Sequence, residues 1–237
     1  FPYPVGLYMM QWSNIRAIAF DLDGTLIDSV PDLAAATNAT LAQNQYQPVT
    51  EALVRSWVGN GAQVLIQRAL SYVSAMPEDA PELQVMLEQI MPQFMHHYGE
   101  HLQKHSRLYP GVVNTLQRLK QAGFKLAIVT NKPYRFTVPL LTAFGLDDLF
   151  SEVLGGDSLA KMKPDPMPLQ HLLKQWQLDE SQLLMIGDSK NDILAAIAAN
   201  VMSIGLTYGY NYGEDIGLSL PHAICENFAD IEQYLLS

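Results

Sequence analysis

Two aspartates lie two residues apart near the start of the chain. Asp21 and Asp23 follow the short apolar run that ends at Phe20, and Gly24 and Thr25 come next. A run of this length predicts a buried parallel strand, and open α/β sheets bind their ligands at the carboxyl ends of such strands. Gly24 permits a sharp turn, and Thr25 offers a hydroxyl and an N–H to an anion. The stretch therefore predicts a reaction centre.

Further polar residues follow later apolar runs in the same way. The run KLAIV precedes a Thr-Asn-Lys triplet, a loop after SEVLGGDSL carries two lysines, and LLMIG precedes two more acids. These residues are Thr130, Asn131, Lys132, Lys161, Lys163, Asp188 and Asp192. Because parallel strands end at one edge of a sheet, we expect these side chains to meet in one crevice.

The charge of that crevice indicates a cofactor. Several carboxylates placed within a few ångströms raise one another's pKa unless a cation is present. Oxygen ligands favour a hard divalent ion, and Mg²⁺ that keeps waters and one phosphate oxygen fits best. No His or Cys lies near these motifs, which disfavours zinc. The sequence therefore predicts Mg²⁺.

The whole chain restricts the partners. A net charge of −10 over 237 residues leaves no basic patch for nucleic acid, and no apolar run approaches the roughly 20 residues of a membrane span. A small anion must therefore be attracted by a local cation. Cys225 is the only cysteine, so a disulfide framework is excluded and the cytoplasm is the expected compartment. We expect residues 1–14 to be a leader segment, and its sequence is a poor match to a signal peptide. The sequence does not indicate an oligomeric state.

The elements that must position these residues fall into two groups. The segment 29–107 has helical patterning and no credible strand, and it predicts helices over 29–43, 50–59, 62–75 and 82–104. A crossover between parallel strands commonly needs one helix, so we expect this segment to be a helical cap. Residues 15–28 and 108–237 alternate strands and helices, with strands expected at 125–130, 151–155, 183–188 and 201–206. This alternation predicts a doubly wound parallel sheet, an α/β Rossmann-like core.

The motifs and their order resemble a known family. DLDGT after an apolar strand, with the later Thr, Lys and Asp motifs in sequence, is similar to the haloacid dehalogenase-like superfamily. This resemblance implies a Mg²⁺-dependent phosphotransferase that works through an aspartyl-phosphate, and one subgroup carries an α-helical cap directly after the first motif. Over most of residues 15–235, the segments VRSWVGNG, NKP, GGDS, GDSKND and TYGYN are also similar to the bacterial phosphoglycolate phosphatases. That similarity implies hydrolysis of 2-phosphoglycolate, a small phosphate ester, to glycolate and phosphate.

The resemblance assigns catalytic roles residue by residue. Asp21 resembles the nucleophile. Asp23 resembles the general acid for the leaving oxygen and the later base for water. Thr130 and the backbone N–H of Asn131 would bind phosphoryl oxygens. Lys163 resembles the lysine that directly precedes proline in the family and stabilises the transition-state charge.

The metal ligands follow from the same resemblance. Asp188 would bind Mg²⁺ together with an Asp21 oxygen and the Asp23 carbonyl. Asp192, four residues after Asp188, could reach the waters of the metal or Lys163 if a helix begins there.

The segment RSWVGNGA, between two predicted cap helices, is the candidate for substrate specificity. Arg55 and the amides around Asn60 could bind the substrate carboxylate, and Gly59 and Gly61 let the backbone approach a ligand. An ordinary helix–helix turn is the alternative. Tyr208, Tyr210 and Tyr212 line the entrance or merely cover an edge of the sheet.

Other activities share some of these motifs. A phosphatase or phosphomutase for another small ester, such as a sugar phosphate, differs in its cap chemistry. A hydrolytic dehalogenase uses the first aspartate but needs no metal. The presence of Asp23 and Asp188 argues against this activity. A phospho-receiver domain is about half this length and lacks the helical insertion.

Overall fold

Six parallel strands form the central sheet. The computed structural model describes residues 12–236, and its strand order is β5-β4-β1-β6-β7-β8. The strands are β1 (Ala17–Phe20), β4 (Lys125–Val129), β5 (Glu152–Leu154), β6 (Leu183–Gly187), β7 (Met202–Leu206) and β8 (Ala223–Cys225). The first strand lies between β4 and β6, so the chain winds outward in both directions from it. The predicted doubly wound parallel core is confirmed.

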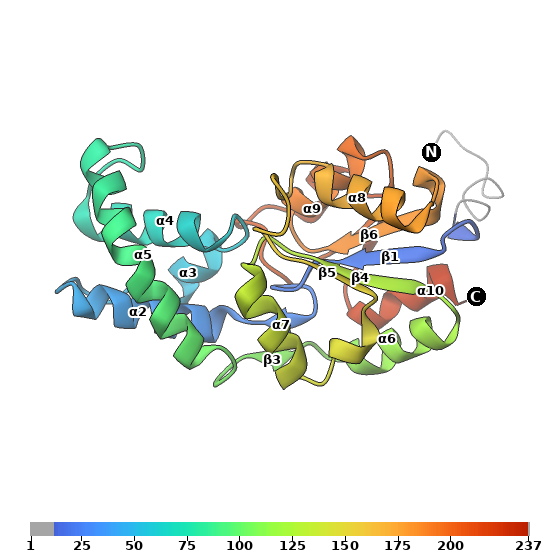
Figure 1. Ribbon diagram of the computed structural model, residues 1–237, viewed down its shortest axis with the longest axis horizontal. Coiled ribbons are helices and arrows are strands. Elements are labelled where there is room, and N and C mark those ends of the chain that lie inside the picture. Colours follow the sequence, from blue (N-terminus) through green and yellow to red (C-terminus); the bar gives the residue numbers. More distant parts are fainter. Residues whose placement is uncertain (1–11, 237) are drawn as a thin grey trace.

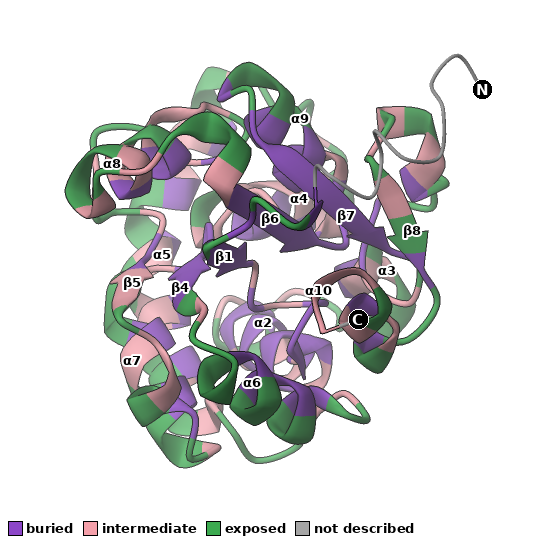
Figure 2. Ribbon diagram, turned by 90° about the vertical axis from the view of Figure 1, so that its right-hand side faces the viewer, coloured by how far each residue is buried: buried purple, intermediate pink, exposed green. Residues whose placement is uncertain are grey.

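Helices cover both faces of this sheet. Helices α8 (Met167–Trp176) and α9 (Lys190–Ala198) lie on one face (Figure 1). The other face is covered by α6 (Val112–Gln121), α10 (Glu232–Leu235) and α7 (Tyr134–Ala143). All four residues of β1 are buried because both of its faces pack against helices. Figure 2 shows that the central strands are buried, whereas the edge strands β5 and β8 are only partly buried.

Four further helices lie at one end of the molecule, beyond the carboxyl ends of the strands (Figure 1). They are α2 (Val30–Gln43), α3 (Glu51–Trp57), α4 (Ala62–Ser74) and α5 (Pro81–His101). Their apolar faces form a separate hydrophobic cluster that includes Leu33, Leu65, Phe94 and Tyr98. We refer to these helices as the cap helices.

Two connections join the cap helices to the sheet, and each contains a short strand that the sequence analysis did not identify. Residues Ile27–Asp28 (β2) and Arg107–Leu108 (β3) pair as antiparallel strands at the two boundaries of the segment 29–107. Two-residue strands are too short to produce a period-2 pattern. Their pairing brings the outgoing and returning chains together at the base of the cap helices.

Local signals at the helix ends were partly correct. Thr50 caps α3 by accepting a hydrogen bond from the Leu53 N–H. Ser29 precedes α2 but makes no capping bond, because its hydroxyl donates to Asp23 instead. Helix α9 begins at Lys190, which places Asp192 in its first turn. After α9, Asn200 adopts the left-handed conformation with φ of 57°.

The amino-terminal prediction is only partly covered by the structure. Residues 1–11 lie outside the described part of the chain. Trp12, which the predicted leader includes, packs into the core of the sheet layer against Tyr234. Within residues 12–236, none of the helices is long and apolar enough to cross a membrane.

Candidate active site

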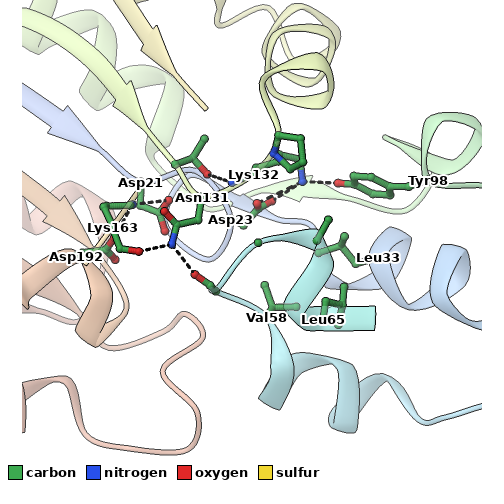
Figure 3. A pocket seen from close by; sticks show the side chains of 15 residues that line it. Asp21, Asp23, Leu33, Val58, Leu65, Tyr98, Asn131, Lys132, Lys163 and Asp192 are labelled. Carbon is green, nitrogen blue, oxygen red and sulfur yellow. Dashed lines mark hydrogen bonds and ion pairs between the residues drawn. The ribbon is translucent and has the colours of Figure 1, made fainter. Parts of the chain in front are cut away.

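The residues that follow β1, β4 and β6 meet at one edge of the sheet, facing the cap helices. Those after β1 and β4 line a cavity together with Lys163, Asp192 and residues of the cap helices (Figure 3). Asp188, directly after β6, is not among the described residues that line this cavity. The predicted site residues in its lining are Asp21, Asp23, Gly59, Gly61, Thr130, Asn131, Lys163 and Asp192. Strand register accounts for this convergence, since Phe20 pairs with both Ile128 and Ile186.

A buried lysine lies between two carboxylates at the centre of this cavity. The Lys163 Nζ is 3.0 Å from Asp21 Oδ1 and 2.6 Å from Asp192 Oδ1, and the Lys163 side chain is 2% exposed. Burial alone would lower the pKa of Lys163, but Asp192 and Asp21 outweigh it and raise that pKa. Burial raises the pKa of Asp21 to about 7, although Lys163 acts in the opposite direction. The lysine is therefore a fixed cation.

Asp188 is held behind this pair by two hydrogen bonds. The Thr25 hydroxyl donates to Oδ1 at 2.6 Å and the Tyr210 N–H donates to Oδ2 at 2.5 Å. Burial raises the pKa of Asp188 well above its usual value, and the charges of Asp21 and Asp192 add to this. Gly24, with φ of 86°, is required here because a Cβ would overlap the Asp188 carboxylate.

Three carboxylates are close enough to share a metal ion. One oxygen each from Asp21, Asp188 and Asp192 lies within 4.8 Å of the others. Asp188 and Asp192 are buried and the Asp21 side chain is 13% exposed. Lys163 is the one cation in contact with these three carboxylates in the described part of the chain, so a divalent cation would relieve their repulsion. Asp192 accepts from Lys163 and Ser189, and Asp188 accepts from Thr25 and Tyr210, so hydrogen bonds hold both carboxylates in place beside Asp21. The donor set fits a divalent metal.

A second buried lysine, which received no role from the sequence, holds Asp23. The Lys132 Nζ lies 3.0 Å from Asp23 Oδ1 and also donates to the Tyr98 hydroxyl (Figure 3). The Ser29 hydroxyl donates to the same Asp23 oxygen at 2.5 Å. Lys132 is 5% exposed, and Asp23 outweighs the effect of burial and raises the pKa of the lysine. Its place directly after Thr130 and Asn131 was the available signal, whereas nothing in the sequence pointed to Tyr98.

The cap side of the cavity is mainly apolar. Leu33, Val58, Leu65 and Tyr98 line it, with the backbone of the loop between α3 and α4 (Figure 3). Such a wall excludes water from the carboxylates and lysines opposite.

Two residues predicted for specificity do not line this cavity in the described chain, namely Arg55 and Asn60. Arg55 lies 3.4 Å from Asp28 and 3.2 Å from Glu51, and its guanidinium covers the ring of Tyr210. Asn60 accepts a hydrogen bond from Tyr212. The structure thus gives Arg55 partners at the base of the cap helices.

Comparison with known proteins identifies the family. The family model for the haloacid dehalogenase-like hydrolases matches residues 18–206. The chain is 49% identical to the phosphoglycolate phosphatase of Vibrio cholerae over 224 residues, which cover 94% of this chain and 98% of the relative. It is 47% identical to the phosphoglycolate phosphatase of Haemophilus influenzae over 219 residues, or 92% and 97% of the two chains.

A solved structure extends this likeness to the fold. The crystal structure of a predicted phosphoglycolate phosphatase from Haemophilus somnus has a TM-score of 0.87 and 46% identity, covering 93% of this chain and 97% of that one. The chain therefore belongs to the haloacid dehalogenase-like hydrolase family and is a phosphatase of that family.

Proposed function

We propose that this protein is a Mg²⁺-dependent phosphatase that hydrolyses 2-phosphoglycolate to glycolate and phosphate through an aspartyl-phosphate on Asp21. The observation that carries the proposal is the buried Lys163 bound to Asp21 and Asp192 beside Asp188. An ionised carboxylate can attack a phosphate dianion only where nearby cations offset their repulsion. The close relatives named phosphoglycolate phosphatase support the substrate.

The residues present account for both chemical steps. An Asp21 oxygen attacks phosphorus, the bond from phosphorus to the glycolate oxygen breaks, and Asp23 gives its proton to that oxygen. Water then attacks the phosphorus of the aspartyl-phosphate and gives a proton back to Asp23. The bond from phosphorus to the Asp21 oxygen breaks, which releases inorganic phosphate and restores the Asp21 carboxylate. Thr130 and the Asn131 N–H bind phosphoryl oxygens while Lys163 stabilises the transferring charge.

Mg²⁺ would be held by Asp21, Asp188 and the backbone carbonyl of Asp23, and when bound it neutralises phosphate charge and orients the ester. Asp192 then acts on Lys163, which it fixes at 2.6 Å. Ser189 in turn fixes Asp192, because its N–H and hydroxyl both donate to Asp192 Oδ2.

The far end of the substrate lies toward the cap helices. Lys132 is the lining cation on this side, and Gly61 and Ala62 also line the cavity. Helix α4 begins at Ala62 without a side-chain cap, so its first N–H groups are available to a carboxylate. A carboxylate one carbon away from the phosphate ester would meet these donors. This assignment shifts the cation for the carboxylate from Arg55, the sequence prediction, to Lys132.

A panel of phosphate esters tests the proposal. With Mg²⁺, we expect kcat/KM for phosphoglycolate to exceed that for sugar phosphates and 4-nitrophenyl phosphate, and a chelator to abolish turnover until Mg²⁺ is returned. Preference for a sugar phosphate would replace the substrate, and dependence on a bisphosphate activator would indicate a mutase. Activity that survives the chelator would contradict the metal assignment.

We also propose that the enzyme works in the cytoplasm, since its one cysteine, Cys225, is a buried core residue.

A further inference from the structure

The loop that connects α3 to α4, residues 58–61, is bound to the core by side chains that have no role in the reaction described above. We call this segment the cap loop. The Asn191 side-chain amide donates to the Gly59 carbonyl at 3.1 Å, and to the Tyr212 hydroxyl at 3.0 Å. The Tyr212 hydroxyl in turn donates to Asn60 Oδ1 at 2.7 Å. Gly59, Asn60, Asn191 and Tyr212 thus form a closed ring of contacts between cap and core.

The backbone on both sides is shaped for this contact. Gly59 has φ of 130°, and a Cβ at this position would overlap the Tyr212 hydroxyl. Tyr212 itself has φ of 55°, a left-handed conformation that costs a non-glycine residue free energy and persists where its surroundings require it. The two unusual conformations let the ring of Tyr212 reach the cap loop.

Two cations enclose the ring of Tyr212. Arg68 of the cap helix α4 lies 5.6 Å from the ring centroid, and its guanidinium also donates to the Trp57 carbonyl at 2.8 Å. Lys190, the first residue of α9, lies 5.1 Å from the same centroid. Cation–π contacts from the cap and from the core therefore hold Tyr212 in place.

The docked loop lies directly on the catalytic elements. Gly59 and Gly61 line the cavity, and the Asn131 side chain donates to the Gly59 carbonyl at 3.0 Å and to the Lys163 carbonyl at 2.8 Å. Asn191 is the neighbour of Asp192 in the first turn of α9. One helical turn thus supports both Lys163, through Asp192, and the cap loop.

We propose that Asn191 and Tyr212 are positioning residues that hold the cap loop closed over the cavity and so select small phosphate esters. The inference rests on the proposed function and adds to it the residues that set closure. With the loop docked, the amides at the start of α4 face the substrate and little room is left beside Leu65 and Tyr98. With the loop released, the chemical groups around Asp21 are intact but the cavity accepts larger esters.

The variant Tyr212→Phe tests this inference because it retains the ring and removes only the hydroxyl. The net value of one hydrogen bond corresponds to about a 3- to 10-fold change, and the Tyr212 hydroxyl makes two. We expect KM for phosphoglycolate to rise by at least that factor, while kcat/KM for the larger 4-nitrophenyl phosphate does not fall. Amide hydrogen exchange over residues 58–65 should accelerate by a similar factor. Tyr72→Phe, on the exposed side of α4, is the matched control and should change neither.

A second variant removes one of these two bonds from the cap side. Asn60→Ala should cause changes in the same direction but smaller than those of Tyr212→Phe, because the Tyr212 hydroxyl keeps its bond to Asn191, and the double variant should not exceed Tyr212→Phe. Equal losses on both substrates with unchanged exchange would overturn the inference, as would exchange and KM identical to the Tyr72→Phe control. If the wild type does not hydrolyse phosphoglycolate, the proposed function fails, yet the exchange comparison still decides whether these residues dock the loop.

Discussion

The Lys163 Nζ lies 3.0 Å from Asp21 Oδ1 and closer still, at 2.6 Å, to Asp192. The lysine is therefore oriented by a residue that needs no contact with the substrate, and it presents its charge to the carboxylate that we propose as nucleophile. Hydrogen bonds between charged groups of this kind are short and directional. Removal of the charge of Lys163 should therefore affect both catalysis and stability.

Replacement Lys163→Met should reduce kcat by at least about 10²-fold, the scale of losing one electrostatic donor to a transition state. It should also destabilise the metal-free protein by about 3–5 kcal/mol, because it leaves two buried carboxylates without their cation. Steady-state kinetics and thermal unfolding without metal measure the two effects. Lys161→Met is the matched control, since Lys161 is exposed and pairs only with Asp165 in the described structure. A loss of activity in the control equal to that in the test variant would contradict the assignment of Lys163.

The buried Asp21 predicts an unusual pH dependence. Its pKa is raised to about 7, mainly by burial, from the 3.8 of an ordinary aspartate. Between these two values the folded state binds more protons than the unfolded state, so the stability of the metal-free protein should fall as pH rises from about 4 to 7. Each pKa unit is worth about 1.4 kcal/mol. Mg²⁺, which binds the ionised carboxylate, should weaken or reverse this fall.

Thermal unfolding of Asp21→Asn, with and without Mg²⁺, checks this prediction. The variant should be inactive, should melt above the metal-free wild type at pH 8, and should show a shallower fall with pH. Asp147→Asn, at an exposed position in a surface turn, should behave as the wild type. A wild-type melting temperature that rises steadily from pH 4 to 7 without metal would be inconsistent with a raised pKa at Asp21.

Patterns carried by neighbouring residues were predictable, and contacts between distant residues were not. The apolar run before Asp21 and the helical periodicity after Ser29 located the central strand and the cap helices, because each signal is local. Lys132 pairs with Asp23 across 109 residues and with Tyr98 across 34, so no local pattern reported these contacts. Ser29 stands at the start of the helix expected over 29–43, but its hydroxyl donates to the carboxylate of Asp23 and does not cap that helix.

Substrate selection distinguishes the two basic residues considered for the glycolate end. Lys132→Met should raise KM for phosphoglycolate by about 10-fold or more, since hydrogen bonds to charged groups are worth about 1.5–3 kcal/mol. The rise for 4-nitrophenyl phosphate should be smaller because its nitrophenyl group carries no carboxylate for Lys132 to bind. Arg55→Ala should change KM for both esters by similar, small factors, because Arg55 contacts Asp28 and Glu51 outside the cavity.

Kinetics of both variants on both esters provide the measurement. Lys132 is the carboxylate ligand if Lys132→Met changes the ratio of the KM values for the two esters and Arg55→Ala does not. The reverse result would restore Arg55 as the carboxylate ligand. Circular dichroism should be used to check that Lys132→Met folds. In this variant Asp23 loses the lysine and keeps the Ser29 hydroxyl as a partner.

Asp32, at the start of α2, joins the two connections between the cap helices and the sheet. Its carboxylate is fully buried and accepts from the His105 N–H at 3.0 Å and from the Ser106 N–H and hydroxyl at 2.7 and 2.6 Å. Asp32→Ala leaves these donors without a partner, and each unsatisfied buried group costs about 1–3 kcal/mol.

The melting temperature of Asp32→Ala should therefore fall by at least about 6 °C, because 1 kcal/mol shifts a protein of this size by about 2–4 °C. Asp32→Asn should lose less, since its amide oxygen still accepts from Ser106. Asp79→Ala, at an exposed position in the loop between α4 and α5, controls for loss of an acid and should have the melting temperature of the wild type. At temperatures below the transition, Asp32→Ala should retain kcat, because Asp32 contacts the connections and not the cavity lining. A melting temperature within 1 °C of the wild type would show that these bonds do not secure the base of the cap helices.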